Sequence, residues 1–265
     1  MLPTLPGVVD THAHLSVCEP ADAELVSAAG EAGVRRILTI GMDERSNAQA
    51  VAAAEAHGGV FACVGRHPNE AAGFDHRAAD DIERAASHPR VRAVGETGLD
   101  YYRDRAPRED QRRAFQAQIE IARRLEKPLV IHVRDGAETT GGEALEEVFE
   151  ILRTRAEGVT VILHCFSAPP ERVPDAVERG WYCSFAGNLT YPRSEELREA
   201  AALVPEELLL VETDSPFLAP QAHRGRANQP AHVVETAGRL AELRELDYPR
   251  LDEIVERNAA RALAW

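Results

Sequence analysis

Residues 128–166 read PLVIHVRDGAETTGGEALEEVFEILRTRAEGVTVILHCF and combine an apolar run (Pro128–Val133), an amphipathic segment (Glu143–Arg155) and a second apolar run (Val159–Phe166). Apolar residues recur every three to four positions in the middle segment, as in a helix with one buried face. The two flanking runs are almost continuously apolar, as in strands that are buried on both faces. The stretch therefore predicts a strand, a helix and a second, parallel strand.

The same alternation continues in both directions from this stretch. The apolar runs are Val8–His14, Val34–Met42, Val60–His67, Val91–Leu99, Pro128–Val133, Val159–Phe166, Trp181–Phe185 and Leu208–Asp214. The segments with helical spacing include Ala21–Ala32, Asn47–His57, Arg108–Glu126, Glu143–Arg155 and Ser194–Leu203. Eight strands separated by helices, with no Pro- or Ser-rich linker, predict an α/β fold in which residues 1–265 form a single domain, a closed (β/α)8 TIM barrel. Pro230 would then open two C-terminal helices, Ala231–Leu246 and Leu251–Ala262.

An open, doubly wound sheet is the structural alternative. Such a sheet usually carries a glycine-rich phosphate loop after its first strand, and this chain has Asp10-Thr11-His12-Ala13-His14 there. The barrel is therefore the favoured fold.

The composition limits the classes of function. The formal net charge is −14, from 44 acidic and 30 basic residues, which argues against a protein that coats DNA non-specifically. The four cysteines form no CxxC pair, which indicates reduced thiols and a cytoplasmic location. No apolar run reaches the ~18 residues of a spanning helix, and no secretory signal is visible. We expect no association with a membrane and no obligate protein partner.

Ligand-type side chains follow the carboxyl ends of the predicted strands. They are His12, His14, His67, Glu96, His132, His164 and Asp214. In a parallel barrel these ends share one rim, where barrel active sites are built, and imidazole and carboxylate groups converging there suit divalent metals. His12 and His14 are two positions apart, so both point to one face of their strand.

Each of these residues also has a simpler interpretation. Glu96 could be a solvated loop acid, although the flanking Gly95 and Gly98 permit a close backbone approach. His132 and His164 could be hydrogen-bonded core residues, and Asp214 could cap a short turn. The six residues other than His67 are harder to explain one by one than as a single metal site. Cys165 should alternate to the other face of its strand and pack there.

Seven sequence motifs resemble those of a known protein family. They are DTHAH, GRHP, GETGLDYY, HVRD, HCFS, LLLVETDSPFLAP and RANQP, in order between Asp10 and Pro230. In this the chain resembles the TatD family of metal-dependent hydrolases, within the amidohydrolase-like barrels. It departs from the family pattern at Ala168, where glycine is usual, and in the loop at residues 138–143.

The resemblance implies a site for two divalent ions (Mg, Mn or Zn). His12, His14 and Asp214 would hold one ion, His132 and His164 the other, and Glu96 would bridge both. The single lysine, Lys127, cannot be the bridging residue, because it begins the fifth strand and so lies at the opposite end of the barrel. Two ions would activate a water molecule, and Asp214 would also accept its proton, so that Asp214 and Glu96 are the predicted catalytic residues. Glu212 would orient a ligand or form a salt bridge inside the barrel.

The activity that the resemblance implies is that of a metal-dependent deoxyribonuclease, an exonuclease whose nucleic-acid partner is single-stranded DNA. The predicted substrate-binding residues are His67, Arg66, Arg134, Arg226 and Asn228. The alternatives are an ester or amide hydrolase, such as an aminoacyl-tRNA deacylase or an amidohydrolase, and a non-catalytic binding barrel. Loss of ligand-type residues would mark the last of these, and none is missing. His67 could equally be a structural histidine in a turn.

Overall fold

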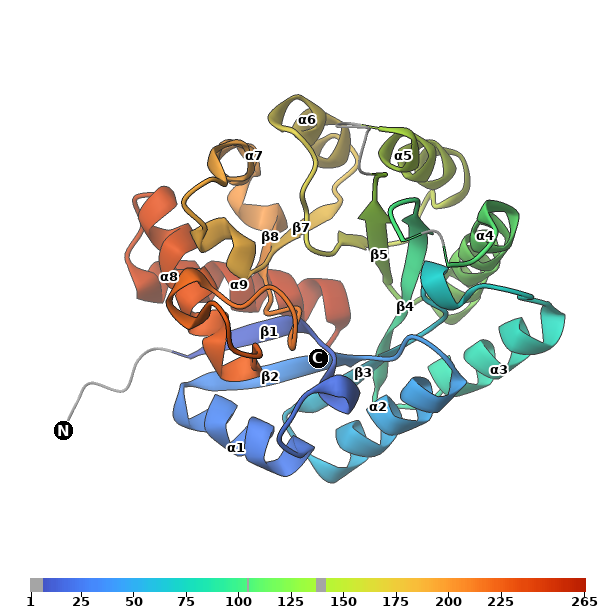
Figure 1. Cartoon of the computed structure of the whole chain (residues 1–265), viewed down its shortest axis with the longest axis horizontal. Helices are drawn as coiled ribbons and strands as arrows, with labels where there is room; N and C mark the ends of the chain where they lie inside the picture. The colour runs from blue at the N-terminus through green and yellow to red at the C-terminus, as the bar shows by residue number, and fades with distance from the viewer. Residues whose placement is uncertain (1–6, 104, 137–141) are drawn as a thin grey trace.

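The computed structural model describes residues 7–103, 105–136 and 142–265. Within these ranges, eight parallel strands form one sheet in the order β1 to β8. Their bounds are β1 Val8–Ala13, β2 Val34–Ile40, β3 Val60–Val64, β4 Val91–Asp100, β5 Leu129–Arg134, β6 Val161–Leu163, β7 Tyr182–Phe185 and β8 Leu209–Val211. A parallel bridge between Ala13 and Ser215 joins the two edges of the sheet, so the strands form a nearly closed barrel (Figure 1).

Helices surround the strands as an outer ring (Figure 1). Their bounds are α1 Asp22–Glu31, α2 Glu44–Ala56, α3 His76–Ala86, α4 Arg108–Leu125, α5 Glu143–Arg155, α6 Val173–Val177, α7 Glu195–Leu203, α8 Val233–Leu243 and α9 Tyr248–Leu263. The last helix packs against β1 and β8, and so covers the place where the barrel closes. None of the helices in the described ranges is long and apolar enough to cross a bilayer.

The predicted barrel with C-terminal helices is confirmed. Strands β3, β6 and β8 are shorter than predicted at their carboxyl ends, where they stop before the polar residues that follow them, whereas β4 and β5 each extend one residue further than predicted. Two helices were not predicted. The face of α3 that contacts the core consists of alanines and a single large apolar residue, Ile82, and α6 has only five residues, so neither has the run of large apolar residues that identified the other helices.

The core lies between the sheet and the helices, and a second layer of side chains fills the barrel. Leu38 and Ile40 of β2 and Phe115 and Ile119 of α4 are fully or almost fully buried. Lys127 lies at the amino end of the barrel, where its Nζ donates to the carbonyl oxygen of Val91 at 2.6 Å. The ligand-type residues lie at the opposite end of the barrel, where the carboxyl ends of the strands are followed by loops.

Candidate metal centre

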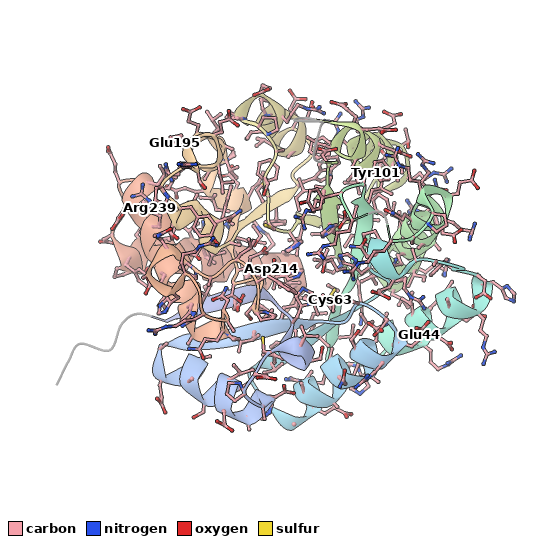
Figure 2. The ribbon with its side chains drawn as sticks, in the orientation of Figure 1. Glu44, Cys63, Tyr101, Glu195, Asp214 and Arg239 are labelled. Atoms are coloured by element: carbon pink, nitrogen blue, oxygen red, sulfur yellow. The ribbon has the colours of Figure 1, made fainter. Side chains whose placement is uncertain are left out.

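Six ligand-type side chains meet at the carboxyl end of the barrel, although only three of them lie in strands. His12 is in β1, Glu96 in β4 and His132 in β5. The other three residues, His14, His164 and Asp214, follow the ends of β1, β6 and β8. Figure 2 shows Asp214 close to the centre of the molecule, away from the outer helices.

One oxygen of Glu96 faces the first pair of histidines. Glu96 Oε2 lies 3.4 Å from His12 Nε2 and 3.6 Å from His14 Nε2. Asp214 Oδ1 lies 3.8 Å and 3.4 Å from the same two nitrogens. Two carboxylate oxygens and two imidazole nitrogens therefore surround one point.

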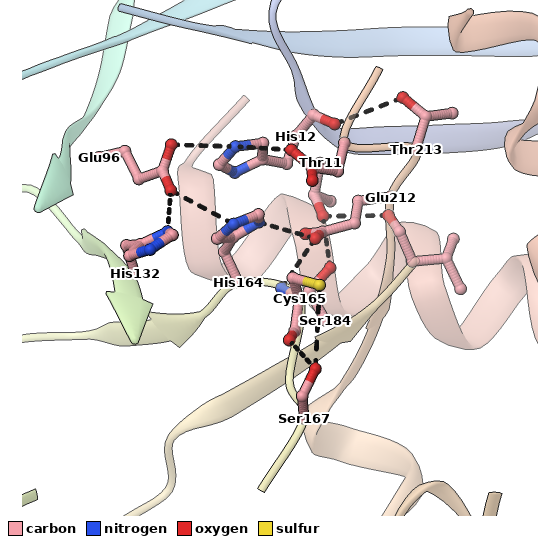
Figure 3. A network of polar contacts seen from close by, with 12 residues as sticks. Thr11, His12, Glu96, His132, His164, Cys165, Ser167, Ser184, Glu212 and Thr213 are labelled. Atoms are coloured by element: carbon pink, nitrogen blue, oxygen red, sulfur yellow. Dashed lines mark hydrogen bonds and ion pairs between the residues drawn. The ribbon is translucent and has the colours of Figure 1, made fainter. Parts of the chain in front are cut away.

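The other oxygen of Glu96 faces a second set of histidines. Glu96 Oε1 lies 2.7 Å from His132 Nδ1, 3.3 Å from His164 Nε2 and 3.6 Å from His67 Nε2. Figure 3 shows one oxygen of Glu96 directed to His12 and the other directed to His132 and His164. A single carboxylate therefore contacts both groups of nitrogen atoms.

Gly98 allows β4 and β5 to approach closely at this point. Its φ is +140°, and a Cβ atom there would collide with the carbonyl oxygen of His132. The register places Gly98 opposite His132. Glycine is needed at this position, and the close approach brings His132 to Glu96.

These donors fit divalent metal ions. His12 Nε2 and His14 Nε2 are 3.2 Å apart, and ligand atoms ~2.0–2.1 Å from one ion at angles near 90–110° are separated by about 3.0–3.4 Å. The Nδ1 atoms of both rings are buried without a hydrogen-bond partner. Three groups of His, Asp or Glu residues place their ligand atoms within 4.8 Å of one another: His12, Glu96 and His164; His12, His14 and Asp214; and His67, Glu96 and His132.

Two of the three histidines in the second set, His164 and His132, have a carboxylate partner behind them. Glu212 Oε1 accepts from His164 Nδ1 at 2.8 Å and from the Cys165 backbone N–H at 2.8 Å. Asp100 Oδ2 lies 3.3 Å from His132 Nε2. Such partners fix the orientation of ligand rings. The contact of Glu212 with His164 fits both of its predicted roles, which are to orient a metal ligand and to form a salt bridge inside the barrel.

Asp100 and Asp10 were not assigned roles from the sequence. Asp100 follows Glu96 by four positions on one strand and so shares its face, a signal that could have identified it. Asp10 accepts from the Thr213 backbone N–H at 2.9 Å and from Thr213 Oγ1 at 2.7 Å. It thereby fixes the backbone next to Asp214.

The ionisation of the centre follows from burial and from its neighbours. Burial alone would raise the pKa of Glu96, but His164, His67 and His12 together hold that pKa well below its usual value. Burial would likewise raise the pKa of Asp214, but a hydrogen bond from His14 and the nearby rings of His164 and His12 hold that pKa below its usual value. Both carboxylates are therefore negatively charged at neutral pH. Burial lowers the pKa of His67 to about 3, so its ring is neutral.

A cavity of about 790 Å³ opens onto the centre. Of the predicted substrate-binding residues, His67 and Arg134 line this cavity, together with Arg103 and Arg105, which had no predicted role. The arginines come from the segments after β4 and at the end of β5. These three arginines form a cationic wall of the cavity, whose lining also includes the carboxylates of Asp100 and Asp135.

The structure does not bring the other three predicted substrate-binding residues into the cavity lining. Arg66 forms an ion pair with Glu44 and donates to the carbonyl oxygen of Glu70. Asn228 is buried and donates through Nδ2 to the carbonyl oxygens of Thr213 and Phe217, both at 2.8 Å. Arg226 is exposed, outside the residues that line the cavity. Asn228 thus supports the loop that carries Asp214.

The expected position of Cys165 was wrong. Cys165 has a φ of +44° and lines the cavity, because β6 ends at Leu163 and strand alternation no longer applies. All four cysteines lie in the described part of the chain, and each is free. Ala168 also lines the cavity, whereas residues 138–141 of the variable loop lie outside the described residues.

The chain matches a family model described as TatD related DNase over residues 9–264. A metal-dependent hydrolase named TatD from Mycobacterium tuberculosis is 40% identical over 269 residues, which cover 97% of this chain and 99% of that protein. A protein from Shigella flexneri named as a 3'-5' ssDNA/RNA exonuclease is 34% identical over 229 residues, covering 84% of this chain and 85% of its own length.

The fold is also found among solved structures. The crystal structure of a TatD homologue from Escherichia coli superposes with a TM-score of 0.88 and 24% sequence identity, covering 97% of this chain and 98% of the other. At this identity the likeness concerns the fold, and it extends over almost the whole barrel.

Proposed function

Because the chain belongs to the TatD family of metal-dependent hydrolases, we propose that it is an exonuclease that hydrolyses the phosphodiester bonds of single-stranded DNA with two divalent ions. The relatives named as exonucleases support nucleic acid as the substrate and the 3' end as the starting point. The position of Glu96, with its two oxygens facing different histidine sets, is the observation that carries the two-ion proposal.

In this proposal His12, His14 and Asp214 would hold one ion, His132 and His164 the other, and Glu96 both. When bound, such ions act as Lewis acids, lower the pKa of water and stabilise the entering and leaving oxygens. Glu96 is negatively charged and contacts both sets of nitrogen atoms. One carboxylate would therefore serve both ions, so that few acidic residues are needed in the centre. Glu212 and Asp100 keep the rings of His164 and His132 in place.

Asp214 is the proposed proton acceptor. Its side chain is 13% exposed, lines the cavity and is ionised, so a carboxylate oxygen can take the proton of an attacking water. Its backbone is held by the bond from its own N–H to the carbonyl oxygen of His12 at 2.9 Å. The proton-accepting carboxylate is therefore already in position before the substrate binds.

His67 is proposed to donate a hydrogen bond to the substrate. Its Nδ1 accepts from the Asn69 backbone N–H at 3.0 Å, so the neutral ring carries its proton on Nε2. That atom lies 3.6 Å from Glu96 Oε1, at the edge of the centre. A non-bridging phosphate oxygen that approaches Nε2 from the cavity would accept this proton in a hydrogen bond.

The arginines favour a phosphodiester over a carboxylic ester or amide. Arg103, Arg105 and Arg134 line the cavity, and guanidinium groups bind phosphate oxygens strongly. A neutral ester or amide has no group that needs three cations. The predicted ester hydrolase activity remains the alternative that the experiment below includes.

The test is hydrolysis by protein that has been stripped with a chelator and then reloaded. We expect no hydrolysis of end-labelled single-stranded DNA by the stripped protein, and recovery with Mg²⁺, Mn²⁺ or Zn²⁺. Duplex DNA, single-stranded RNA and an aminoacyl ester are the comparison substrates. Full turnover by protein that elemental analysis shows to be metal-free would overturn the proposal, and faster turnover of the ester would favour the alternative.

We also propose a reducing, cytoplasmic location. Its support is the set of four free cysteines, of which Cys63 and Cys183 are buried in the barrel.

A further inference from the structure

Phe217 presents an exposed aromatic ring beside the candidate metal centre. Its side chain is 51% exposed, it lines the cavity, and it follows Asp214 by three positions. Its ring centroid lies 5.9 Å from that of His14, with an angle of 72° between the planes. A near-perpendicular contact leaves at least one face of the phenyl ring uncovered by His14.

The backbone holds Phe217 in place without help from a ligand. The Phe217 N–H donates to the carbonyl oxygen of Asp214 at 2.8 Å, and the Phe217 carbonyl oxygen accepts from Asn228 Nδ2 at 2.8 Å. Asn228 is buried and bonded to His232. The exposed ring is therefore carried by a fixed loop, and little conformational entropy would be lost when a ligand contacts it.

The cavity thus offers two kinds of surface to a ligand. Three arginines and the candidate metal centre would bind anionic oxygens, and Phe217 offers a flat apolar face. A nucleotide carries both a phosphate and a flat base, which few other phosphate esters do. Aromatic rings in proteins that bind single strands stack on bases of any sequence.

We propose that Phe217 stacks on the base of a nucleotide that flanks the scissile phosphate. This inference rests on the proposed function, and it adds a reason for strand selectivity. A base within a duplex is already stacked and paired, and exposing it costs a few kcal/mol. A base at the end of a single strand can turn onto Phe217 at much lower cost, so single strands are the preferred substrates.

The experiment compares two oligonucleotides of equal length. One is natural, and the other carries abasic residues at the two nucleotides that flank the scissile phosphate. We expect Phe217→Ala to raise KM for the natural strand by about 5- to 160-fold, the range that one lost stacking contact implies. KM for the abasic strand should change by less than about twofold, because that strand has no base to lose. Phe217→Trp should keep the natural strand near the parental KM.

Leu203→Ala is the matched control, since Leu203 is 57% exposed and lies outside the cavity lining. Phe217→Leu keeps apolar bulk against His14 without an aromatic face, and it replaces the alanine variant if that variant folds poorly. An equal rise in KM for both strands, or no rise for the natural one, would overturn the stacking role while leaving the nuclease intact. Failure of the parental, metal-loaded protein to cleave either strand would overturn the proposed function and this inference together.

Discussion

His164 Nδ1 donates a hydrogen bond to Glu212 Oε1 across 2.8 Å, and both side chains are almost entirely buried at the carboxyl end of the barrel. The contact fixes the imidazole ring so that its other nitrogen, Nε2, points to Glu96. A carboxylate behind a histidine also increases the basicity of the nitrogen that faces a metal. The two residues therefore act as one unit, although they are 48 positions apart.

We expect Glu212→Gln to weaken binding of one ion by about 10- to 100-fold, the usual effect of losing such a partner. The glutamine keeps an acceptor for His164 and for the Cys165 N–H, so the fold should persist. Calorimetric titration of the chelated protein with Mn²⁺ measures the change. Glu207→Gln, at an exposed position, is the control for the altered net charge. Equal Mn²⁺ affinity in the parental protein and in Glu212→Gln would contradict the orienting role.

Glu96→Gln tests the bridge itself. The amide retains the shape of the side chain but removes the negative charge that faces both histidine sets. We expect the bound metal to fall below two ions per chain and the rate of hydrolysis to fall by ~10²-fold or more, with an unchanged circular dichroism spectrum. Elemental analysis after gel filtration gives the stoichiometry, with Glu195→Gln on the outer surface (Figure 2) as the control. Two ions per chain in the variant would show that Glu96 is not the bridge.

The barrel could be predicted because its signal is repeated eight times along the chain. Each strand is a short, almost continuous apolar run, and six of the eight runs have a ligand-type residue at or near the same end. The meeting of six ligand-type residues follows from the parallel topology, since strand ends of one kind share one rim. Gly98 also indicated, from the sequence, that the backbone could be approached closely there. In the structure the absence of a side chain at Gly98 lets His132 reach Glu96.

The residues that we propose to bind the substrate were harder to predict, because most of them lie in loops. Periodicity gives the face of a residue within a strand, but it fails once the strand has ended, as at Cys165. Arg66 follows β3 and Arg134 ends β5, yet Arg66 pairs with Glu44 and Arg134 lies over the ring of Tyr102 at 4.1 Å. Only the fold decides which arginine has an acidic neighbour.

His232 gives a prediction about acid stability. Burial and the stacked ring of His223 lower the pKa of His232 to about 4, against about 6.5 in an unfolded chain. Below pH 6.5 the unfolded chain therefore binds a proton that the folded chain does not, and the free energy of unfolding falls as the pH falls toward 4. Urea unfolding of metal-free protein at pH 7 and at pH 4.5 should show a smaller loss for His232→Gln than for the parental chain. The exposed His76→Gln is the control, and an equal loss in all three proteins would contradict the prediction.

The cationic wall predicts a modest dependence of binding on salt. Log–log slopes for single strands are about −0.7 per neutralised phosphate, so one to three contacts from Arg103, Arg105 and Arg134 give a slope between about −0.7 and −2.1. Fluorescence anisotropy of a labelled strand at several salt concentrations measures it. Arg134→Gln should reduce the slope by about 0.7, and Arg226→Gln, outside the cavity lining, should not change it. A slope near −5.6, equivalent to eight contacts, would indicate an extended basic groove instead.

Asp214→Asn separates metal binding from proton transfer. The backbone of Asp214 has a φ of +54°, a conformation that asparagine also adopts readily, and the bond from its N–H to the carbonyl oxygen of His12 does not involve the side chain. The variant should therefore fold and keep the ion held by Glu96, His132 and His164. The amide oxygen can still contact a cation weakly, but it cannot accept the proton of an attacking water. Loss of a general base costs ~10²–10⁴-fold in rate, so we expect single-turnover hydrolysis at saturating metal to slow by at least that range, while the oligonucleotide still binds. A single-turnover rate within about tenfold of the parental protein would assign the proton to another group, and His67 would then be the next residue to replace.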